Sequence, residues 1–275
     1  MFTRSRRHAP AVLACSFFLA MGAATPAFAL DPLLPPSGNF ELQNWKLTLP
    51  SASEVMPWVL DNGYELKDTF YTHTTSGGMV FRTPNIANST ANSNYPRTEL
   101  REMLAPHESA SSNVNNWTPE KGGRLKARLK VDRVSTTGES GKVGRVIVGQ
   151  IHGPDTEPAR LYFHKLPGEA KGRLYLATET FGGSNSYSTD IVSNKDGDGI
   201  ALGELFTYTI TMKGTRVQVD IVRKQGTLVN TYIKFVDSNY LGENMYFKAG
   251  VYNQNNTGST SDYAQATFYS LVATH

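Results

Sequence analysis

Cysteine, long apolar runs and extended helical patterns are nearly absent from this chain of 275 residues. The one cysteine, Cys15, lies in an N-terminal segment that we expect to be removed, so the remaining chain cannot form disulfide bonds. Beyond that segment, no apolar run approaches the ~20 residues that a membrane-spanning helix requires. A disulfide-stabilised scaffold and a membrane-spanning protein are therefore both excluded for residues 30–275.

The N-terminal segment has the pattern of a secretory signal peptide. It begins with three arginines, continues through an apolar stretch at residues 11–24 and ends in Ala27-Phe28-Ala29, a small-x-small cleavage signature. We predict that residues 1–29 are removed, that the protein is secreted (extracellular or periplasmic), and that it then has no membrane attachment. Val12-Leu13-Ala14-Cys15 offers a lipoprotein alternative, but the apolar run continues past the cysteine.

Excess charge of either sign is also missing. The full chain has 27 basic and 24 acidic residues, but the signal segment holds three arginines and no acid, which leaves 24 of each. A neutral protein has no global field that attracts a polyanion, so affinity for one must come from a local cluster of cations. Nucleic acid as a partner loses its main compositional support, and we expect none.

Alternating apolar and polar residues recur through residues 30–275 and predict an all-β domain. Gly, Asn, Asp or Pro clusters separate many of the segments, and this number of short strands favours a sandwich or jelly roll of two packed sheets in a single domain. One short helix is predicted near Pro35–Leu42. The predicted strands are Trp45–Leu49, Met79–Arg82, Thr98–Leu104, Gly123–Val134, Val143–His152, Ala159–His164, Arg173–Glu179, Leu205–Lys213, Arg216–Arg223, Thr227–Phe235, Met245–Asn253 and Ala264–Ala273.

Two long polar loops, residues 84–96 and 182–199, are candidates for flaps over a binding site or for plain surface loops. Within the second loop, Asn194–Gly199 resembles the first half of a calcium loop. The glutamate that such a loop needs is replaced by Leu205, so we interpret the segment as a polar turn and expect no metal.

Three distant segments place polar or ionisable residues at every second position: Arg97-Thr98-Glu99-Leu100-Arg101, Gln150-Ile151-His152 and the run from Tyr246 to Gln254. Successive side chains of a strand point to opposite faces, so each segment has one apolar face and one face of polar or ionisable residues. If the three strands are neighbours, one sheet face carries arginines, a lysine, a histidine, a glutamine and tyrosines. That set suits an extended anionic substrate.

Each segment alone also has an ordinary structural explanation. Alternating Arg and Glu can form cross-strand ion pairs, His152 can be a hydrogen-bonded residue at a strand end, and Tyr and Lys can simply lie on a solvated face. Gly250, between Lys248 and Tyr252, is the less common feature. We interpret it as a gap where a substrate chain approaches the backbone.

Together the three segments resemble the signatures of the alginate lyases of polysaccharide lyase family 7, in the same order along the chain. Trp45-Lys46-Leu47-Thr48-Leu49-Pro50 and Ala266-Thr267-Phe268-Tyr269-Ser270-Leu271 are also similar to that family. The resemblance covers most of residues 40–273. It implies that residues 30–275 form one catalytic jelly-roll β-sandwich of two antiparallel sheets, with a substrate cleft on the concave sheet. The implied activity is cleavage of the 1,4 bonds of alginate by β-elimination, which leaves a 4,5-unsaturated uronate. We expect endolytic cleavage, although the sequence does not distinguish it from exolytic cleavage.

The resemblance also implies roles for four catalytic residues. Arg97 and Gln150 would neutralise the uronate carboxylate, and such preorganised donors contribute ~3–4 kcal/mol each. A tyrosine hydroxyl, with a reference pKa of ~10, is protonated at neutral pH, so Tyr252 can act as the acid. In mannuronate it would also act as the base, assisted by a nearby cation, whereas His152 would be the base for guluronate. Ile151 corresponds to the family variant associated with guluronate-containing substrate.

A second set of residues is expected to bind the polymer around the reacting sugar: Arg101, Glu99, Lys248, Tyr246, Asn253 and Gln254. The elimination needs no metal or cofactor, and we expect the protein to be a monomer. A non-catalytic polyuronate-binding sandwich with the same cationic face is the main alternative. A glycoside hydrolase is less favoured, because that chemistry normally needs two suitably spaced carboxylates and no strand supplies an E-x-D-x-x-E pattern.

Overall fold

The computed structural model describes residues 29–91, 93–104, 116–181 and 183–275. The predicted signal peptide therefore lies outside the described residues except for Ala29, and its removal stays a prediction. No helix in the described ranges is both long enough and apolar enough to cross a bilayer.

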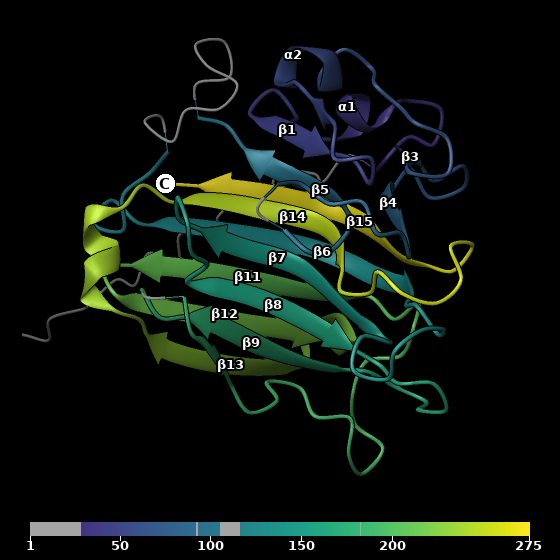
Figure 1. The fold of residues 1–275 in the computed structure, drawn as a ribbon. Helices are drawn as coiled ribbons and strands as arrows, with labels where there is room; N and C mark the ends of the chain where they lie inside the picture. The colour runs from purple at the N-terminus through teal and green to yellow at the C-terminus, as the bar shows by residue number, and fades with distance from the viewer. Residues whose placement is uncertain (1–28, 92, 105–115, 182) are drawn as a thin grey trace, which may run out of the picture.

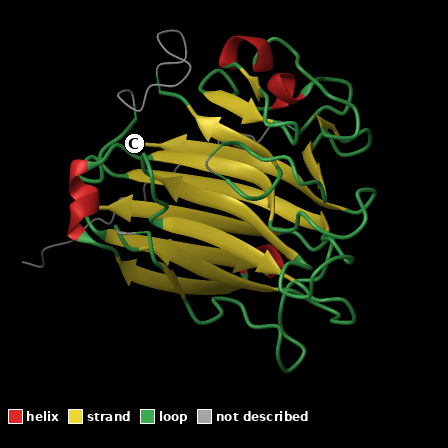
Figure 2. Ribbon diagram, in the orientation of Figure 1, coloured by secondary structure: helices red, strands yellow, loops and turns green. Residues whose placement is uncertain are grey.

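Two antiparallel sheets packed face to face make up most of the molecule (Figures 1 and 2). The eight-stranded sheet, here called the site sheet, has the order β10 (Asn185–Tyr187), β9 (Arg173–Glu179), β8 (Ala159–His164), β7 (Arg145–His152), β14 (Tyr246–Asn253), β5 (Arg97–Glu102), β1 (Trp45–Thr48) and β2 (Glu54–Val55). The seven-stranded back sheet has the order β13 (Leu228–Phe235), β12 (Arg216–Arg223), β11 (Phe206–Lys213), β6 (Gly123–Arg133), β15 (Tyr263–Thr274), β4 (Met79–Pro84) and β3 (Phe70–Thr72). The predicted all-β sandwich is confirmed.

Every predicted strand is present, with its ends shifted by two residues or fewer. The predicted short helix is also present, as α1 (Pro36–Asn39). The sequence analysis missed the short strands β2, β3 and β10 and three short helices. Those helices are α2 (Pro57–Leu60), η2 (Lys224–Gly226) and η3 (Ser238–Gly242). Elements of two to five residues bury too few side chains to leave a periodic signal.

The two sheets bury their residues differently, and the difference positions the site. In β6 of the back sheet, Leu125, Ala127 and Leu129 are buried while the residues between them are exposed, as in a sheet with one solvated face. In β5 and β14 every residue is buried. The outer face of the site sheet is therefore largely covered at these two central strands, and the polar side chains there must find partners.

Gly250 has a structural role that differs from the predicted one. Its φ is +143°, and a Cβ at this position would lie 2.6 Å from the Thr98 carbonyl oxygen and 3.1 Å from Phe81 Cδ1. The pairing of β14 with β7 is irregular between Ala249 and Tyr252. The missing side chain thus makes room for β5 and the core, and the interpretation of Gly250 as space for substrate is wrong.

We predict that Gly250→Ala lowers the free energy of unfolding by ~1–3 kcal/mol, because it adds both a strained backbone conformation and a steric overlap. Urea unfolding followed by circular dichroism measures the change. Gly141→Ala is the matched control, since no heavy atom lies within 4 Å of its added Cβ. Equal unfolding midpoints for the two variants would contradict this account.

Candidate active site

The three segments with polar or ionisable residues at every second position lie side by side in the site sheet. β14 pairs with β5 on one side and with β7 on the other. The register places Lys248 opposite both Arg101 and Gln150, and it places Tyr246 opposite His152. The geometric hypothesis from the sequence is confirmed.

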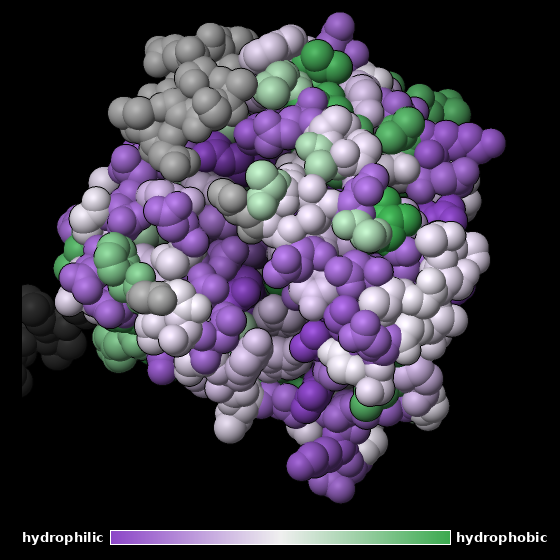
Figure 3. Space-filling model, viewed as in Figure 1, coloured by the Kyte–Doolittle hydropathy of each residue, from purple (hydrophilic) through white to green (hydrophobic). Residues whose placement is uncertain are grey.

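A cavity of about 470 Å³ opens on this face of the sheet. In the same view as Figure 1, the surface in Figure 3 is mostly hydrophilic and is hollowed near its middle. The predicted site residues that line the cavity are Arg97, Arg101, His152, Tyr246, Lys248 and Tyr252. Thr90 and Ser93 also line it, so the first predicted flap, residues 84–96, reaches the site.

The fully buried Glu99 connects the polar residues beneath this cavity. Its carboxylate accepts hydrogen bonds from Arg97 Nη1 at 3.1 Å and from Gln150 Nε2 at 2.5 Å, and Lys248 Nζ lies 2.8 Å away. Burial alone would raise the pKa of Glu99, but Lys248 and Arg97 hold that pKa below its ordinary value. Glu99 therefore positions the donors from below, and its predicted contact with substrate is incompatible with its burial.

Gln150 occupies a different position from the one expected. It is fully buried and does not line the cavity. Its amide nitrogen donates to Glu99, and its Oε1 is buried without a hydrogen-bond partner. The amide that we predicted to bind the substrate carboxylate thus donates its hydrogen bond to Glu99, within the sheet itself.

Tyr252 is in contact with two polar groups. The guanidinium carbon of Arg97 lies 3.7 Å from the centre of the tyrosine ring. The Tyr252 hydroxyl is 2.9 Å from Ser93 Oγ. Arg97 Nη2 donates a hydrogen bond to Ser93 Oγ at 2.6 Å. Sequence analysis missed Ser93, although the polar loop before the arginine strand pointed to this segment.

His152 is held between two acceptors. Its Nδ1 lies 2.5 Å from the Gly153 carbonyl oxygen, and its Nε2 lies 3.1 Å from Glu157 Oε1. The imidazole ring stacks on Tyr246 with a centroid separation of 4.9 Å. Sequence analysis also missed Glu157, which is in a loop and follows no periodic pattern.

The carboxyl groups of Glu157 and Glu179 lie next to each other beside His152. Burial would raise the pKa of Glu157, but its hydrogen bond and charge interaction with His152 hold that pKa well below its usual range. Burial and the neighbouring Glu157 raise the pKa of Glu179 to about 7. The negative charge of the pair therefore resides on Glu157, facing the imidazole.

Three further cations line the cavity: Lys248, Arg101 and Lys46, the last paired with Glu54 at 2.8 Å. Burial, and then repulsion by Arg97, lower the pKa of Lys248 to about 8, although Glu99 opposes the shift. The guanidinium of Arg101 lies 4.0 Å from the centre of the Tyr246 ring. Burial raises the pKa of Tyr246 to about 12, so this phenol stays neutral.

Asn253 and Gln254 do not line the cavity, although we predicted both as binding residues. Asn253 is fully buried toward the back sheet, where its amide donates to Asn85 Oδ1 at 2.8 Å. The alternation of β14 turns it away from the face that carries Tyr252. Gln254 is nearly buried, and its Oε1 accepts a hydrogen bond from Tyr162 at 3.4 Å.

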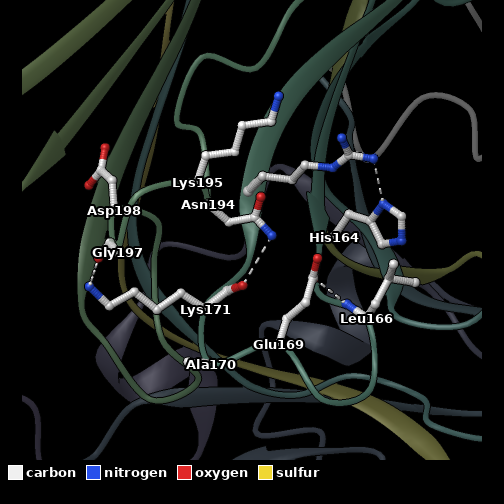
Figure 4. A pocket seen from close by; sticks show the side chains of 10 residues that line it. His164, Leu166, Glu169, Ala170, Lys171, Asn194, Lys195, Gly197 and Asp198 are labelled. Carbon is white, nitrogen blue, oxygen red and sulfur yellow. Dashed lines mark hydrogen bonds between the residues drawn. The ribbon is translucent and has the colours of Figure 1, made fainter.

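The calcium-like turn Asn194–Gly199 has its oxygens engaged by cations of the protein. Lys171 Nζ donates to the Gly197 carbonyl oxygen at 2.7 Å, and Arg223 Nη1 donates to Asp198 Oδ1 at 2.9 Å (Figure 4 shows the first contact). In the part of the chain that the structure describes, no three His, Cys, Asp or Glu side chains are grouped to hold a metal ion.

A β-sandwich with cations, tyrosines and a histidine in a cavity of one sheet has the features of a sandwich enzyme that acts on an anionic polysaccharide. The chain belongs, within that class, to the alginate lyases of polysaccharide lyase family 7, since the alginate lyase family model matches residues 40–275. It is 38% identical to an alginate lyase of Klebsiella pneumoniae, over 95% of both chains.

Solved structures agree with this assignment. The crystal structure of the alginate lyase from Klebsiella pneumoniae superimposes with a TM-score of 0.80, at 37% identity, over 88% of this chain and 98% of that one. Alginate lyase A1-II', described as a member of polysaccharide lyase family 7, gives a TM-score of 0.68 at 32% identity, over 88% and 98% of the two chains. The fold is the jelly roll of this family, as the sequence predicted.

We predict that kcat/KM for alginate falls as the pH rises through about 8, because Lys248 then loses the charge that attracts carboxylates. Lys248→Arg should move this alkaline decline to higher pH, since a guanidinium stays charged. Lys126→Arg, on the back sheet, is the control and should keep the parent profile. An unchanged profile in Lys248→Arg would show that another group controls the decline.

Proposed function

We propose that this protein is a secreted alginate lyase that cleaves 1,4 bonds inside the polymer by β-elimination and prefers guluronate-containing blocks. The observation that supports it best is the shared cavity of Arg97, His152 and Tyr252, with Lys248 on the same wall. Two solved complexes of A1-II' variants, described as containing substrate (GGMG) and product (GGG), support a uronate oligosaccharide as the ligand.

Charge neutralisation is the first requirement of this chemistry. The C5 proton of a uronate is weakly acidic because the adjacent carboxylate already carries a negative charge. Arg97 and Lys248 present cationic donors to the cavity, and Glu99 holds both from below. Donors fixed in this way before substrate binds need no reorganisation when the enolate-like intermediate forms.

Proton transfer is the second requirement. Tyr252 protonates the departing O4, and for mannuronate it also removes the C5 proton, with the Arg97 guanidinium 3.7 Å from the centre of its ring. For guluronate the base is His152. Nδ1 faces the Gly153 carbonyl and Nε2 faces Glu157 Oε1 at 3.1 Å, so Nε2 is the atom that must give up its proton to this carboxylate before it can accept the C5 proton.

The guluronate preference in this proposal depends on His152 rather than on Ile151. Ile151 is fully buried in the core and cannot contact the substrate. A change of one methylene at such a position supports only modest discrimination. His152 lines the cavity, where a second base is useful.

Product analysis on guluronate-rich, mannuronate-rich and mixed alginate tests the proposal directly. We expect new ultraviolet absorbance from unsaturated ends, fastest on guluronate-rich polymer, with intermediate-sized oligomers appearing early. Tyr252→Phe should bind alginate with nearly the parent Kd and release no product. Alginate binding by the parent without product on any of the three polymers would favour a non-catalytic binding module instead.

We predict that His152→Ala lowers kcat on guluronate-rich alginate by ~10²-fold or more, as expected for loss of a general base. The loss on mannuronate-rich alginate should be much smaller, because Tyr252 serves both roles there. Initial rates on the two block types measure the ratio. Equal losses on both polymers would remove the two-base mechanism.

A further inference from the structure

A row of side chains continues from Tyr252 across the outer face of the site sheet. The register places Ile147 opposite Tyr252, Tyr162 opposite Ile147, and Tyr175 opposite Tyr162. Three strand spacings of ~4.8 Å put Tyr175 ~14 Å from Tyr252. These residues form one buried cluster, separate from the core between the sheets. The sheet face beneath the cavity therefore continues into a region that none of the three motifs reaches.

The far end of this row is an aromatic platform. The rings of Tyr162 and Tyr175 stack with a centroid separation of 4.9 Å and an interplanar angle of 7°. Tyr187, from β10, meets both rings edge-on at 6.5 and 6.2 Å. Tyr175 is only 8% exposed, whereas Tyr187 is 57% exposed. Tyr187 thus rises above the platform and offers an accessible aromatic surface, where apolar faces of a sugar can pack.

Two arginines flank the platform. Arg145, at the start of β7, contacts Tyr175 and forms no ion pair with any carboxylate in the described ranges. Arg173, in β9, lies 3.6 Å from Asp190 and 5.5 Å from the centre of the Tyr175 ring. Two guanidinium groups and the carboxylate of Asp190 therefore line the cavity beside the platform, which leaves one positive charge in excess there, while Glu169 acts on His164 from outside that cavity.

His164 shows the effect of this excess charge. Burial, followed by the charges of Arg173 and Arg145, lowers the pKa of His164 to about 4, so the ring is neutral. Its Nδ1 lies 3.2 Å from Arg173 Nη2 and accepts a hydrogen bond from it. The remaining proton is then on Nε2, and the Val143 backbone acts on the ring as a hydrogen-bond acceptor that only partly offsets the shift. Figure 4 shows His164 at the border of the neighbouring cavity.

A cavity of about 480 Å³ lies against these groups, lined among others by Arg145, Arg173, Tyr175 and Tyr187. Guanidinium groups bind carboxylates through paired hydrogen bonds, and an aromatic wall suits a sugar ring. Arg160, on the same face, differs because it already lies 3.7 Å from the carboxylates of both Glu157 and Glu179.

We propose that Arg145, Arg173 and Tyr187 form a distal subsite for a uronate sugar of the same polymer chain whose bond is cleaved at Tyr252. The inference rests on the proposed function and extends it, because it assigns a second, remote contact for the polyuronate. Binding energy at a remote sugar accelerates the reaction only for chains long enough to reach it. The subsite thus makes the enzyme favour long chains and internal bonds.

Size-graded oligouronates test the proposal. The parent kcat/KM should rise with chain length and show a step where the chain first reaches the subsite. The Arg145→Gln and Tyr187→Ala variants should cleave short oligomers like the parent. Their kcat/KM for long oligomers should be about tenfold lower than that of the parent, which is equivalent to the loss of one charge-assisted contact. The matched controls are Arg124→Gln and Phe235→Ala, both exposed on the back sheet, and they should keep the step.

Binding is measured separately in a Tyr252→Phe background by calorimetry. Arg145→Gln should weaken the binding of long oligomers and leave the Kd of short ones unchanged. Identical length dependence in the parent and both variants would overturn the subsite, as would an equal loss on short and long chains. If the parent cleaves no alginate, the proposed function fails. The length dependence of binding then still decides whether the subsite exists.

Discussion

The site depends on one fully buried carboxylate. Glu99 lies beneath the cavity and holds Arg97, Lys248 and Gln150 at hydrogen-bond distance. Removing it would leave two cations in a dry environment, a loss of ~3–5 kcal/mol for one buried pair. One negative charge also balances only one of the two cations. This cluster of three residues therefore keeps one positive charge in excess, which the carboxylate of a uronate sugar can neutralise.

The two sheets show how such a cluster can exist in a protein with no net charge. The back sheet follows a simple rule, with apolar residues inside and charged residues in water, as in β6. The site sheet has polar residues on its outer face that are buried under a loop, with Ser93 in contact with Arg97 and Tyr252. Those side chains are buried except where they line the cavity, so the polar groups are fixed by one another, and electrostatic interactions are stronger than on an open surface.

Sequence periodicity predicted the strands because alternation is a local property, and family resemblance supplied their neighbours. The same alternation, applied strictly, would have excluded Asn253, since Tyr252 faces the cavity and its neighbour must face the core. Other features depend on tertiary partners. The acceptor that Gln150 finds, the contact of Glu157 with His152, and the close packing around Gly250 all involve atoms brought together only by folding.

Excess positive charge also links substrate binding to proton uptake. Burial and repulsion by Arg97 lower the pKa of Lys248 in the free protein. A uronate carboxylate in the cavity opposes that repulsion, so it raises the pKa of Lys248 and favours the charged form. By linkage, a proton bound at Lys248 strengthens the binding of the carboxylate. The same cation that costs free energy to bury in the empty site is thus stabilised by the substrate, which makes the bound state the electrostatically balanced one.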